Sequence, residues 1–392
     1  MSNPNPVLVI GGGPSGLAVS ACLTMSRIPY TVLEQRAHVG SSWRGHYERL
    51  HLHTVKQHSA LPGLAFPREA PTYPSRQQVV DYLSSYAEHF DIRPLFGQRV
   101  RRAAYKDGTW QLETDDGAGG GRTLVGRALV VATGYNRVPL LPTWLGDAEF
   151  RGPRLHSSAY KSGRAYRGKR VLVVGAGNSG AEIALDLWEC GAEVGMSVRS
   201  PVHVVPRDLL GIPAQVTSLQ LFSRLPPRVA DRLSLLALRG VYGDLSRYGL
   251  RTPDLGPISQ VVERGRIPLI DIGTVELIKQ GKIKVHPGIA RFTPEGAVFT
   301  DGTERPFDAV VLATGYRAGL EDFLSDAVHV VGERGTPRWH GEECPIPSRG
   351  LYFIGFRNPL TGQLHDIARE AERIAADLAR SATAPQTGGG HA

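Results

Sequence analysis

The chain has 392 residues, of which 41% are hydrophobic and 21% are charged, and its formal net charge is +8. This composition is typical of a globular protein, and the length allows two domains that each bury a core. The basic residues are scattered and accompany no nucleic-acid motif, so we expect them to attract phosphorylated cofactors rather than nucleic acid.

No targeting or membrane-spanning segment is apparent. The N-terminus leads into a strand without a basic region before it, and the apolar run at residues 233–238 is far shorter than a span of roughly 20 residues. The three cysteines, Cys22, Cys190 and Cys344, form no C-x-x-C pair and no cluster typical of metal ligands. We therefore expect a cytoplasmic protein with no membrane partner.

A glycine-rich turn follows the first predicted strand. The apolar residues 7–10 predict a buried strand, and Gly11, Gly13 and Gly16 follow it at the spacing G-x-G-x-x-G. Such a turn lets the backbone approach a pyrophosphate closely.

The residues after this turn complete a nucleotide-binding pattern. A helix is predicted over residues 14–27, and its free N–H groups would point at the pyrophosphate. The next predicted strand, residues 30–34, ends in Glu34, where a carboxylate can bind a ribose diol. Together these elements predict a dinucleotide site.

The stretch up to residue 100 carries weaker signals. Small residues followed by Trp43 and Arg44 predict a turn, and the alternation at residues 50–53 predicts a half-buried strand. His51 and His53 could hold a metal, but no third ligand is evident nearby, so we expect no metal site. Residues 75–90 have one apolar face and predict a helix.

Short strands are predicted next. Three strand-like runs lie between residues 100 and 131, with a tight turn at Asp107-Gly108 and a looser loop at residues 117–121. Residues 129–135, which end in Ala-Thr-Gly-Tyr, predict a buried strand that breaks at Gly134.

The same pattern then begins again. A strand predicted over residues 170–174 precedes a second G-x-G-x-x-G turn at residues 175–180, and a helix follows. The strand predicted over residues 193–198 leads to Arg199, and residues 310–316 end again in Ala-Thr-Gly-Tyr. This internal repeat predicts two dinucleotide domains of one design.

The two halves differ in the charge that would meet the adenosine ribose. Glu34 would repel a 2′-phosphate, whereas Arg199, flanked by Ser197 and Ser200, would attract one. The first site therefore suits FAD, and the second suits NADPH.

We predict an α/β fold of two Rossmann-like, three-layer domains, with the NADPH domain inserted in the FAD domain. The predicted FAD domain covers residues 1–165 and 317–380, and the NADPH domain covers residues 166–316. Residues 381–392 are predicted to form a disordered tail.

The segment between the halves carries a family fingerprint. Phe150, Gly152, His156 and Tyr160 together resemble the motif F-x-G-x-x-x-H-x-x-x-[FY] of flavin-containing monooxygenases. The Baeyer–Villiger branch of the family would have Trp-Pro where this chain has Tyr160-Lys161, so the resemblance is not to that branch.

Other stretches narrow the resemblance to a subgroup. Residues 40–44 resemble the family's flavin-side G-x-W-R turn, although Ser41 replaces a glycine of the commonest form. Many members have an asparagine before the equivalent of Lys56, where this chain has Thr54 and Val55. The stretches most similar to the YUCCA-type subgroup, the plant auxin-forming monooxygenases and their bacterial relatives, are residues 50–67, 73–86 and 266–285.

The resemblance implies an NADPH-dependent flavin monooxygenase with FAD, NADPH and O2 as cofactors and co-substrate. In this family the reduced flavin captures O2 as a C4a-hydroperoxide, and the protein supplies positioning and desolvation. The peroxide attacks a carbonyl in its anionic form and oxygenates nitrogen or sulfur in its protonated form.

The motifs and the resemblance together imply the residues of the site. The catalytic candidates are Lys56, Trp43 and His156. The predicted FAD-binding residues are Gly11, Gly13, Pro14, Ser15, Gly16, Glu34, Gln35, Ser42, Trp43, Arg44, His53, Val100, Thr133, Gly134, Gly362 and Gln363. The predicted NADPH-binding residues are Tyr73, Gly175, Gly177, Asn178, Ser179, Ser197, Arg199, Ser200, Thr314 and Gly315.

Several alternatives remain open. The substrate could be an aromatic 2-oxo acid such as indole-3-pyruvate, which would be decarboxylated, or an amine or thioether that is oxygenated at nitrogen or sulfur. A non-oxygenating NADPH-flavin oxidoreductase, a disulfide reductase and a flavin-binding sensor share parts of the pattern, but a disulfide reductase needs a redox dithiol that is absent here. We expect a monomer or a homodimer.

Overall fold

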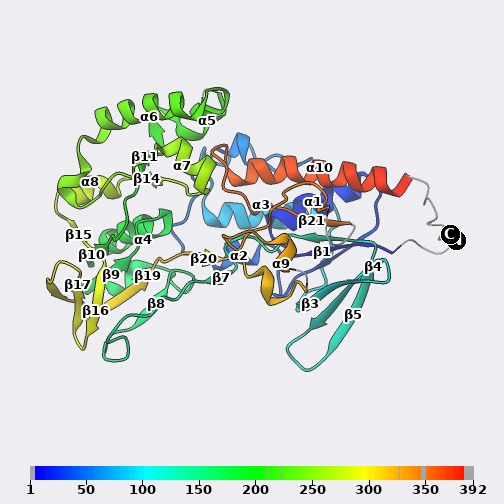
Figure 1. Cartoon of the computed structure of the whole chain (residues 1–392), viewed down its shortest axis with the longest axis horizontal. Coiled ribbons are helices and arrows are strands. Elements are labelled where there is room, and N and C mark those ends of the chain that lie inside the picture. Colours follow the sequence, from blue (N-terminus) through cyan, green and yellow to red (C-terminus); the bar gives the residue numbers. More distant parts are fainter. Residues whose placement is uncertain (1–4, 210, 221, 326, 346–349, 384–392) are drawn as a thin grey trace.

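Two parallel sheets lie side by side in the computed structural model and define two halves of the molecule (Figure 1). The structure describes residues 5–209, 211–220, 222–325, 327–345 and 350–383.

The first half is built on a four-stranded sheet in the order β2-β1-β6-β21, in which all neighbours are parallel. Its strands are β1 (Val7–Ile10), β2 (Tyr30–Leu33), β6 (Ala128–Val131) and β21 (Leu351–Phe353). Every residue of β1, β6 and β21 is buried, as expected for a parallel sheet that is covered on both faces.

Helices cover one face of this sheet and an antiparallel sheet covers the other. The helices are α1 (Pro14–Met25), α3 (Arg76–His89) and α10 (Gln363–Thr383), and the antiparallel strands are β3 (Arg99–Lys106), β4 (Thr109–Asp115) and β5 (Gly121–Gly126). The side chains of β1 alternate between the two faces, with Val7 and Val9 toward the helices and Leu8 and Ile10 toward the antiparallel sheet. The result is three layers.

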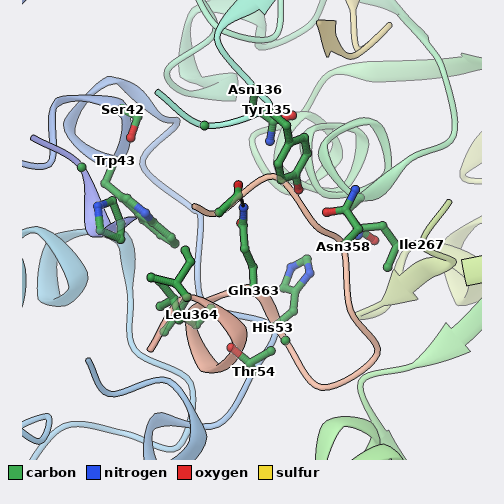
Figure 2. A pocket seen from close by; sticks show the side chains of 18 of the residues that line it. Ser42, Trp43, His53, Thr54, Tyr135, Asn136, Ile267, Asn358, Gln363 and Leu364 are labelled. Carbon is green, nitrogen blue, oxygen red and sulfur yellow. Dashed lines mark hydrogen bonds between the residues drawn. The ribbon is translucent and has the colours of Figure 1, made fainter. Parts of the chain in front are cut away.

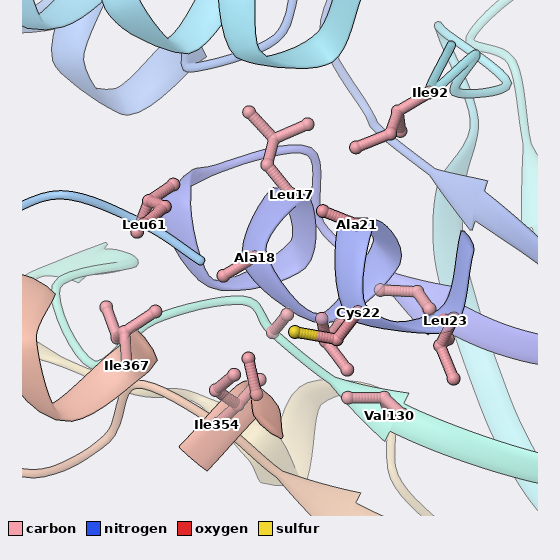
Figure 3. Packing of buried hydrophobic residues seen from close by; sticks show 14 of the residues in the cluster. Leu17, Ala18, Ala21, Cys22, Leu23, Leu61, Ile92, Val130, Ile354 and Ile367 are labelled. Atoms are coloured by element: carbon pink, nitrogen blue, oxygen red, sulfur yellow. The ribbon is translucent and has the colours of Figure 1, made fainter. Parts of the chain in front are cut away.

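Helix α1 is the centre of the first core (Figure 3). Small residues such as Ala18 and Ala21 let it lie close to its neighbours, and its buried residues face β6, α10 and the chain around Leu61. Cys22 lies in this core, where burial and then the charge of Glu372 raise the pKa of its thiol to about 12. The thiol is therefore protonated and unreactive at neutral pH.

The second half repeats the plan with a five-stranded parallel sheet in the order β15-β10-β9-β19-β8. These strands are β8 (Arg154–His156), β9 (Arg170–Val174), β10 (Glu193–Ser197), β15 (Ile283–His286) and β19 (Ala309–Leu312). Helices α4 (Asn178–Glu189) and α8 (Thr274–Lys279) cover one face, and the antiparallel strands β16 (Ile289–Thr293), β17 (Gly296–Phe299) and β18 (Glu304–Pro306) cover the other. The predicted α/β class is confirmed.

A further group of elements joins β10 to β15 and lies above the second sheet in Figure 1. It consists of β11 (Val204–Pro206), β12 (Asp208–Leu209), β13 (Ile212–Pro213), α5 (Ala214–Gln220), η3 (Phe222–Arg224), α6 (Pro227–Tyr242), η4 (Leu245–Tyr248), α7 (Pro257–Arg264) and β14 (Leu269–Asp271). We call these residues, 204–271, the roof segment.

Short elements complete the fold. They are α2 (Ser41–Gly45), η1 (Lys56–His58), β7 (Val138–Pro139), η2 (Gly163–Tyr166), β20 (Tyr316–Arg317), η5 (Leu320–Asp322) and α9 (Ala327–Val330). Strands β7 and β20 form a two-residue antiparallel pair where the chain leaves the first half and where it returns.

Three predicted segments differ from the structure. Residues 50–53 form no strand, because this segment runs toward the second half and, among the described residues, its backbone pairs in a single bridge, between His51 and Ser75. The strand predicted from residue 129 to a break at Gly134 already ends at Val131. Residues 381–383 continue α10, and the rest of the predicted tail lies outside the described residues.

The predicted domain bounds assign residues up to 165 to the first domain. Strand β8 nevertheless pairs with β19 of the second sheet. We therefore propose that the inserted domain begins before Arg154. Among the described residues, no helix is long and apolar enough to cross a membrane.

Candidate active site

One cavity of about 790 Å³ extends from the first glycine turn, between the two halves, to the inner side of the roof segment. Figure 2 shows its central part, in which Gln363 is seen between Leu364 and His53, and Tyr135 lies near Asn358. The predicted site residues that line the cavity are Gly11, Gly13, Pro14, Ser15, Glu34, Gln35, Ser42, Trp43, His53, Val100, Thr133, Gly134, Asn178, Ser179, Gly362 and Gln363.

The first glycine turn has a shape that only glycine permits. Gly11 has φ +114°, and a Cβ there would lie 2.6 Å from the carbonyl oxygen of Ala132. A Cβ on Gly16 would lie 1.8 Å from the carbonyl oxygen of Gly11, so Gly16 lies under the turn rather than in the cavity wall. Gly13 precedes the first residue of α1 and has open space around it, which suits a pyrophosphate at the helix N-terminus.

Glu34 lies just past the end of β2 and is buried at the cavity wall. Its carboxylate accepts hydrogen bonds from the N–H groups of Gly12, at 2.8 Å, and Arg36, at 2.9 Å. Burial raises the pKa of this carboxyl, and these two N–H groups oppose the rise. The carboxylate is thereby fixed beside the glycine turn, where a ribose would lie.

An unsatisfied polar atom also belongs to a residue of the cavity wall. Thr133 Oγ1 is buried and has no hydrogen-bond partner in the described structure, and Gly134 has φ +72°. Buried polar groups normally have partners, so an orphaned hydroxyl in a cavity wall fits a polar ligand. The cradle of Gly11 and Gly16, Glu34 and Thr133 together fit a flavin dinucleotide.

The second glycine turn copies the first. Gly175 also has φ +114°, and a Cβ on Gly180 would lie 2.1 Å from the carbonyl oxygen of Gly175. Gly177 precedes α4 as Gly13 precedes α1. The residues therefore fit a second dinucleotide, although Gly175 and Gly177 lie outside the cavity wall.

The end of β10 is more basic than the sequence alone indicated. Arg199 is exposed, and Arg251 Nη2 donates a hydrogen bond to its carbonyl oxygen at 2.7 Å. Ser197, which we expected at the nucleotide, instead donates its hydroxyl to the carbonyl of Pro287 at 2.8 Å. Ser200 is half-buried.

Other predicted nucleotide residues are engaged within the protein. Asn178 Oδ1 accepts the N–H of Ile270 at 2.7 Å, and Thr314 donates its hydroxyl to the carbonyl of Leu140 at 2.6 Å. Gly315 has φ +88° and its carbonyl meets His156. Tyr73 lies outside the cavity wall, because its hydroxyl donates to Asp208.

Lys56 does not line the cavity, contrary to the catalytic role that we considered. Its ammonium group donates to the carbonyl oxygens of Arg68, at 2.6 Å, of Ala70 and of Pro67. The side chain thereby fixes the loop around residues 67–70, and its donors are not available to a substrate.

His156 also lies outside the cavity wall. Nε2 lies 3.0 Å from the carbonyl oxygen of Gly315, Nδ1 lies 3.0 Å from Ser158 Oγ, and the ring meets Tyr316 edge-on. Burial lowers the pKa of its imidazole. The geometry is that of a structural histidine that joins β8 to the turn after β19.

The side chains of the predicted flavin-side turn, residues 40–44, point in different directions. Ser42 and Trp43 lie on α2 and line the cavity. Arg44 points away from it, because Nη2 donates to Ser84 Oγ at 2.8 Å and Nε donates to the carbonyl of Val39 at 3.1 Å.

The N-terminus of α10 also lines this region of the cavity. Gly362 has φ +98°, and Gln363 is the first residue of α10 and donates to the carbonyl of Gly355 at 3.2 Å. A helix N-terminus beside the cavity can stabilise negative charge there.

Gln215 is a cavity residue that the sequence did not reveal. It comes from α5 of the roof segment, accepts the N–H of Val55 at 2.7 Å and donates to the carbonyl of Thr361 at 2.6 Å. It therefore joins three segments that are far apart in the chain. An isolated glutamine in a short helix carries no signal that could have predicted this.

Comparison with known proteins assigns the chain to a family. The protein-family model described as flavin-binding monooxygenase-like matches residues 5–336 of this chain. The chain is 42% identical over 376 residues to indole-3-pyruvate monooxygenase YUCCA1 of Oryza sativa subsp. japonica, an alignment that covers 94% of this chain and 90% of that protein.

Solved structures share the fold. A flavin-containing monooxygenase from Stenotrophomonas maltophilia has a TM-score of 0.73 at 24% identity, with 97% of this chain and 100% of that chain covered. A complex of OTEMO with FAD and NADP has a TM-score of 0.72 at 18% identity, with 97% of this chain and 86% of that chain covered.

A cavity that runs from one such glycine turn to the first residues of the helix after a second is typical of oxidoreductases that use two dinucleotides. The chain belongs to the flavin-binding monooxygenase-like family. It is an NADPH-dependent flavin monooxygenase, and the resemblance to the YUCCA-type subgroup is confirmed.

Proposed function

We propose that this enzyme uses FAD, NADPH and O2 to convert an aromatic 2-oxo acid of the indole-3-pyruvate type into the acid with one carbon fewer. The observation that carries the proposal is the single cavity joining the first glycine turn, the start of α4 and the apolar roof. The similarity to an indole-3-pyruvate monooxygenase over 94% of the chain supports the choice of substrate.

The overall reaction balances without a further reactant. One 2-oxo acid, one O2, one NADPH and one proton give the shortened carboxylate, CO2, water and NADP+. Bound FAD, reduced by NADPH, would supply the activation of O2. The protein's own residues bind, orient and exclude water.

Binding residues are available for both nucleotides. The N-termini of α1 and α4 would each hold a pyrophosphate, and Glu34 would bind the ribose of FAD. Arg199, with Arg251 beside it, would bind the 2′-phosphate of NADPH.

The roof side of the cavity suits an apolar ring. Its lining there includes Leu209, Phe222, Leu238, Ile258 and Ile267. Such a wall would exclude water, which prevents side reactions and strengthens polar contacts within the cavity. It also gives an indole ring an apolar surface to pack against.

Polar groups line the same cavity. Tyr135 and Asn358 both line the cavity, and hydrogen bonds with Asn136 and Asn358 oppose the rise that burial causes in the pKa of the Tyr135 hydroxyl. Uncharged donors of this kind can orient a carbonyl or carboxylate without binding it too tightly for release.

The test is anaerobic reduction of the purified protein by NADPH, followed by mixing with O2 and a panel of substrates. We expect indole-3-pyruvate to yield indole-3-acetate and CO2 in proportion to the NADPH consumed. A sulfoxide or N-oxide from a thioether or amine, without decarboxylation of any 2-oxo acid, would instead support heteroatom oxygenation.

We also propose that the enzyme acts in the cytoplasm as a monomer or a homodimer. The buried, protonated thiol of Cys22 is compatible with a reducing compartment. Sedimentation equilibrium of the FAD-bound protein measures the oligomeric state, and a higher oligomer would contradict the proposal.

A further inference from the structure

A segment of the first half enters the core of the second. Tyr47, which follows α2, is only 2% exposed and packs among the apolar residues of the second half, with its ring 6.3 Å from that of Tyr160. A few residues later the same segment reaches the cavity wall at His53 and Thr54 (Figure 2). The position of this wall therefore depends on the second half.

A buried carboxylate meets the segment there. Glu182 lies on α4, and its side chain is 1% exposed. Oε2 accepts a hydrogen bond from the Tyr47 hydroxyl at 2.9 Å. His53 Nε2 lies 3.3 Å from the same oxygen, without hydrogen-bond geometry and without another partner in the described structure.

The carboxylate is incompletely satisfied. Its Oε1 is buried and has no hydrogen-bond partner among the described residues, and the Arg49 guanidinium comes no closer than 3.9 Å. Arg49 is directed elsewhere, because Nε and Nη2 donate to the two oxygens of the exposed Glu189 at 2.9 and 2.7 Å. A buried carboxylate with so few partners is costly, and stability alone gives little reason to place one here.

The Tyr47 hydroxyl keeps its proton and donates it in a hydrogen bond to this carboxylate. Burial and the nearby charge of Glu182 raise the pKa of the Tyr47 hydroxyl well above its ordinary value. A hydrogen bond with Ser179, which lies in the first turn of α4, opposes this rise. One network therefore joins the second glycine turn to the flavin-side wall of the cavity.

We propose that Glu182 is a positioning residue that fixes residues 47–53 relative to the start of α4, and so sets the register between the two nucleotides. The inference rests on the proposed use of NADPH to reduce the flavin. Hydride transfer needs the donor and acceptor atoms about 3–3.5 Å apart, and a misplacement of 1 Å can cost about a hundredfold in rate.

The experiment compares Glu182→Gln with Glu189→Gln in the FAD-bound protein. The control, Glu189→Gln, changes an acid that lies on the same helix and binds Arg49, the arginine nearest to Glu182. Glu189 is exposed and does not touch Tyr47 or His53. Stopped-flow absorbance gives the rate constant of anaerobic flavin reduction and the Kd of NADPH, and hydrogen exchange reports the amides of residues 47–58.

For Glu182→Gln we expect flavin reduction at saturating NADPH to slow by tenfold or more, with less than a threefold change in the Kd of NADPH. Amide exchange in residues 47–58 should rise by tenfold or more, while α3 keeps its parental exchange. Glu189→Gln should match the parent in the reduction rate and in the Kd of NADPH, and the exchange of residues 47–58 should change by less than threefold, because the ion pair that it removes is exposed.

Tyr47→Phe supplies a second variant if Glu182→Gln does not retain FAD, because it removes only the hydroxyl and keeps the ring in the core. It should change the reduction rate and the exchange of residues 47–58 in the same direction. Parental values in Tyr47→Phe or in a folded Glu182→Gln protein would overturn the inference. A parent whose flavin NADPH does not reduce would instead overturn the proposed function.

Discussion

At the scale of single residues, we propose that the exposed cation just past the end of β10, Arg199, selects NADPH over NADH. Arg199 has no ion-pair partner in the described structure, and Arg251 reaches its carbonyl. A 2′-phosphate would therefore meet cationic groups that are otherwise unneutralised, and charge-assisted hydrogen bonds of this kind are worth about 1.5–3 kcal/mol.

We expect Arg199→Ala to raise the Kd of NADPH by roughly tenfold to a hundredfold. The Kd of NADH should change by less than threefold, because NADH has no 2′-phosphate. Titration of the protein with each nucleotide measures both values, and Lys284→Ala is a control at an exposed cation on the neighbouring strand β15. Equal losses for the two nucleotides would contradict the assignment.

Lys56 is expected to act on stability rather than on chemistry. Lys56→Ala removes the donor to three loop carbonyls, so we expect a loss of about 1–2 kcal/mol in the free energy of unfolding. Product formed per NADPH oxidised should stay within twofold of the parent. Urea denaturation and a coupling assay measure the two effects, and a large loss of coupling would return Lys56 to the catalytic candidates.

Glu370 is a buried acid with an unusual titration. It is fully buried on α10, Oε2 accepts the N–H of Gly355 at 2.8 Å, and Oε1 has no hydrogen-bond partner in the described structure. Burial, and then the charge of Asp366, raise the pKa of this carboxyl to about 7 from an ordinary value of 4.5. The folded protein therefore holds a proton there that the unfolded chain releases between these two pH values.

Because the folded state binds more protons in this range, the contribution of Glu370 to stability falls as the pH rises from 4.5 to 7. The loss is at most about 3 kcal/mol. Glu370→Gln should remove this slope, so it should equal the parent near pH 4.5 and exceed it at pH 8 in urea denaturation. Glu372→Gln, an exposed acid on the same helix, should keep the parental slope.

At the scale of elements, the two glycine turns explain how a helix is held against a strand. The Cβ that Gly180 lacks would lie 2.1 Å from a backbone oxygen of Gly175, so any side chain there moves α4 away from β9. This close approach, rather than turn flexibility alone, makes glycine necessary at the third position of the motif.

We expect Gly180→Ala to weaken NADPH binding by tenfold or more and to leave FAD bound, because only the second turn is displaced. Gly240→Ala on α6 is the control, since a Cβ there meets nothing within 4 Å and alanine favours the helix. Flavin absorbance and NADP+ titration separate the two sites. Loss of both cofactors in Gly180→Ala would show that the halves do not bind independently.

Local patterns predicted these elements well. The strand, glycine turn, helix and acidic or basic strand end depend on residues within about 30 positions of one another, so both turns, Glu34 and Arg199 could be placed from the sequence. The apolar runs also gave β1, β9 and the helix α3 to within a residue or two.

Contacts between distant segments could not be predicted in the same way. Lys56 points toward the loop around residues 67–70 because carbonyl oxygens converge there, and His156 contacts the carbonyl oxygen of Gly315. Gln215 and Glu182 join segments more than 100 residues away, and nothing in their own neighbourhoods marks them. Such roles follow from the packing of the halves.

At the scale of the whole molecule, two copies of a three-layer plan share one cavity. The second copy is inserted in the sequence of the first. The last strand of the first copy, β21, and its helix α10 therefore follow the inserted half in the chain. The cavity wall therefore needs both halves and the returning chain, which explains why a single motif gives an incomplete site.

The pairing of β7 with β20 has a mechanical consequence. The outgoing and returning connections run side by side as a short ribbon, and Arg137 on one donates to the carbonyl of Ala318 on the other at 2.9 Å. A rotation of the inserted half relative to the first half would therefore twist both connections together, about an axis close to this ribbon.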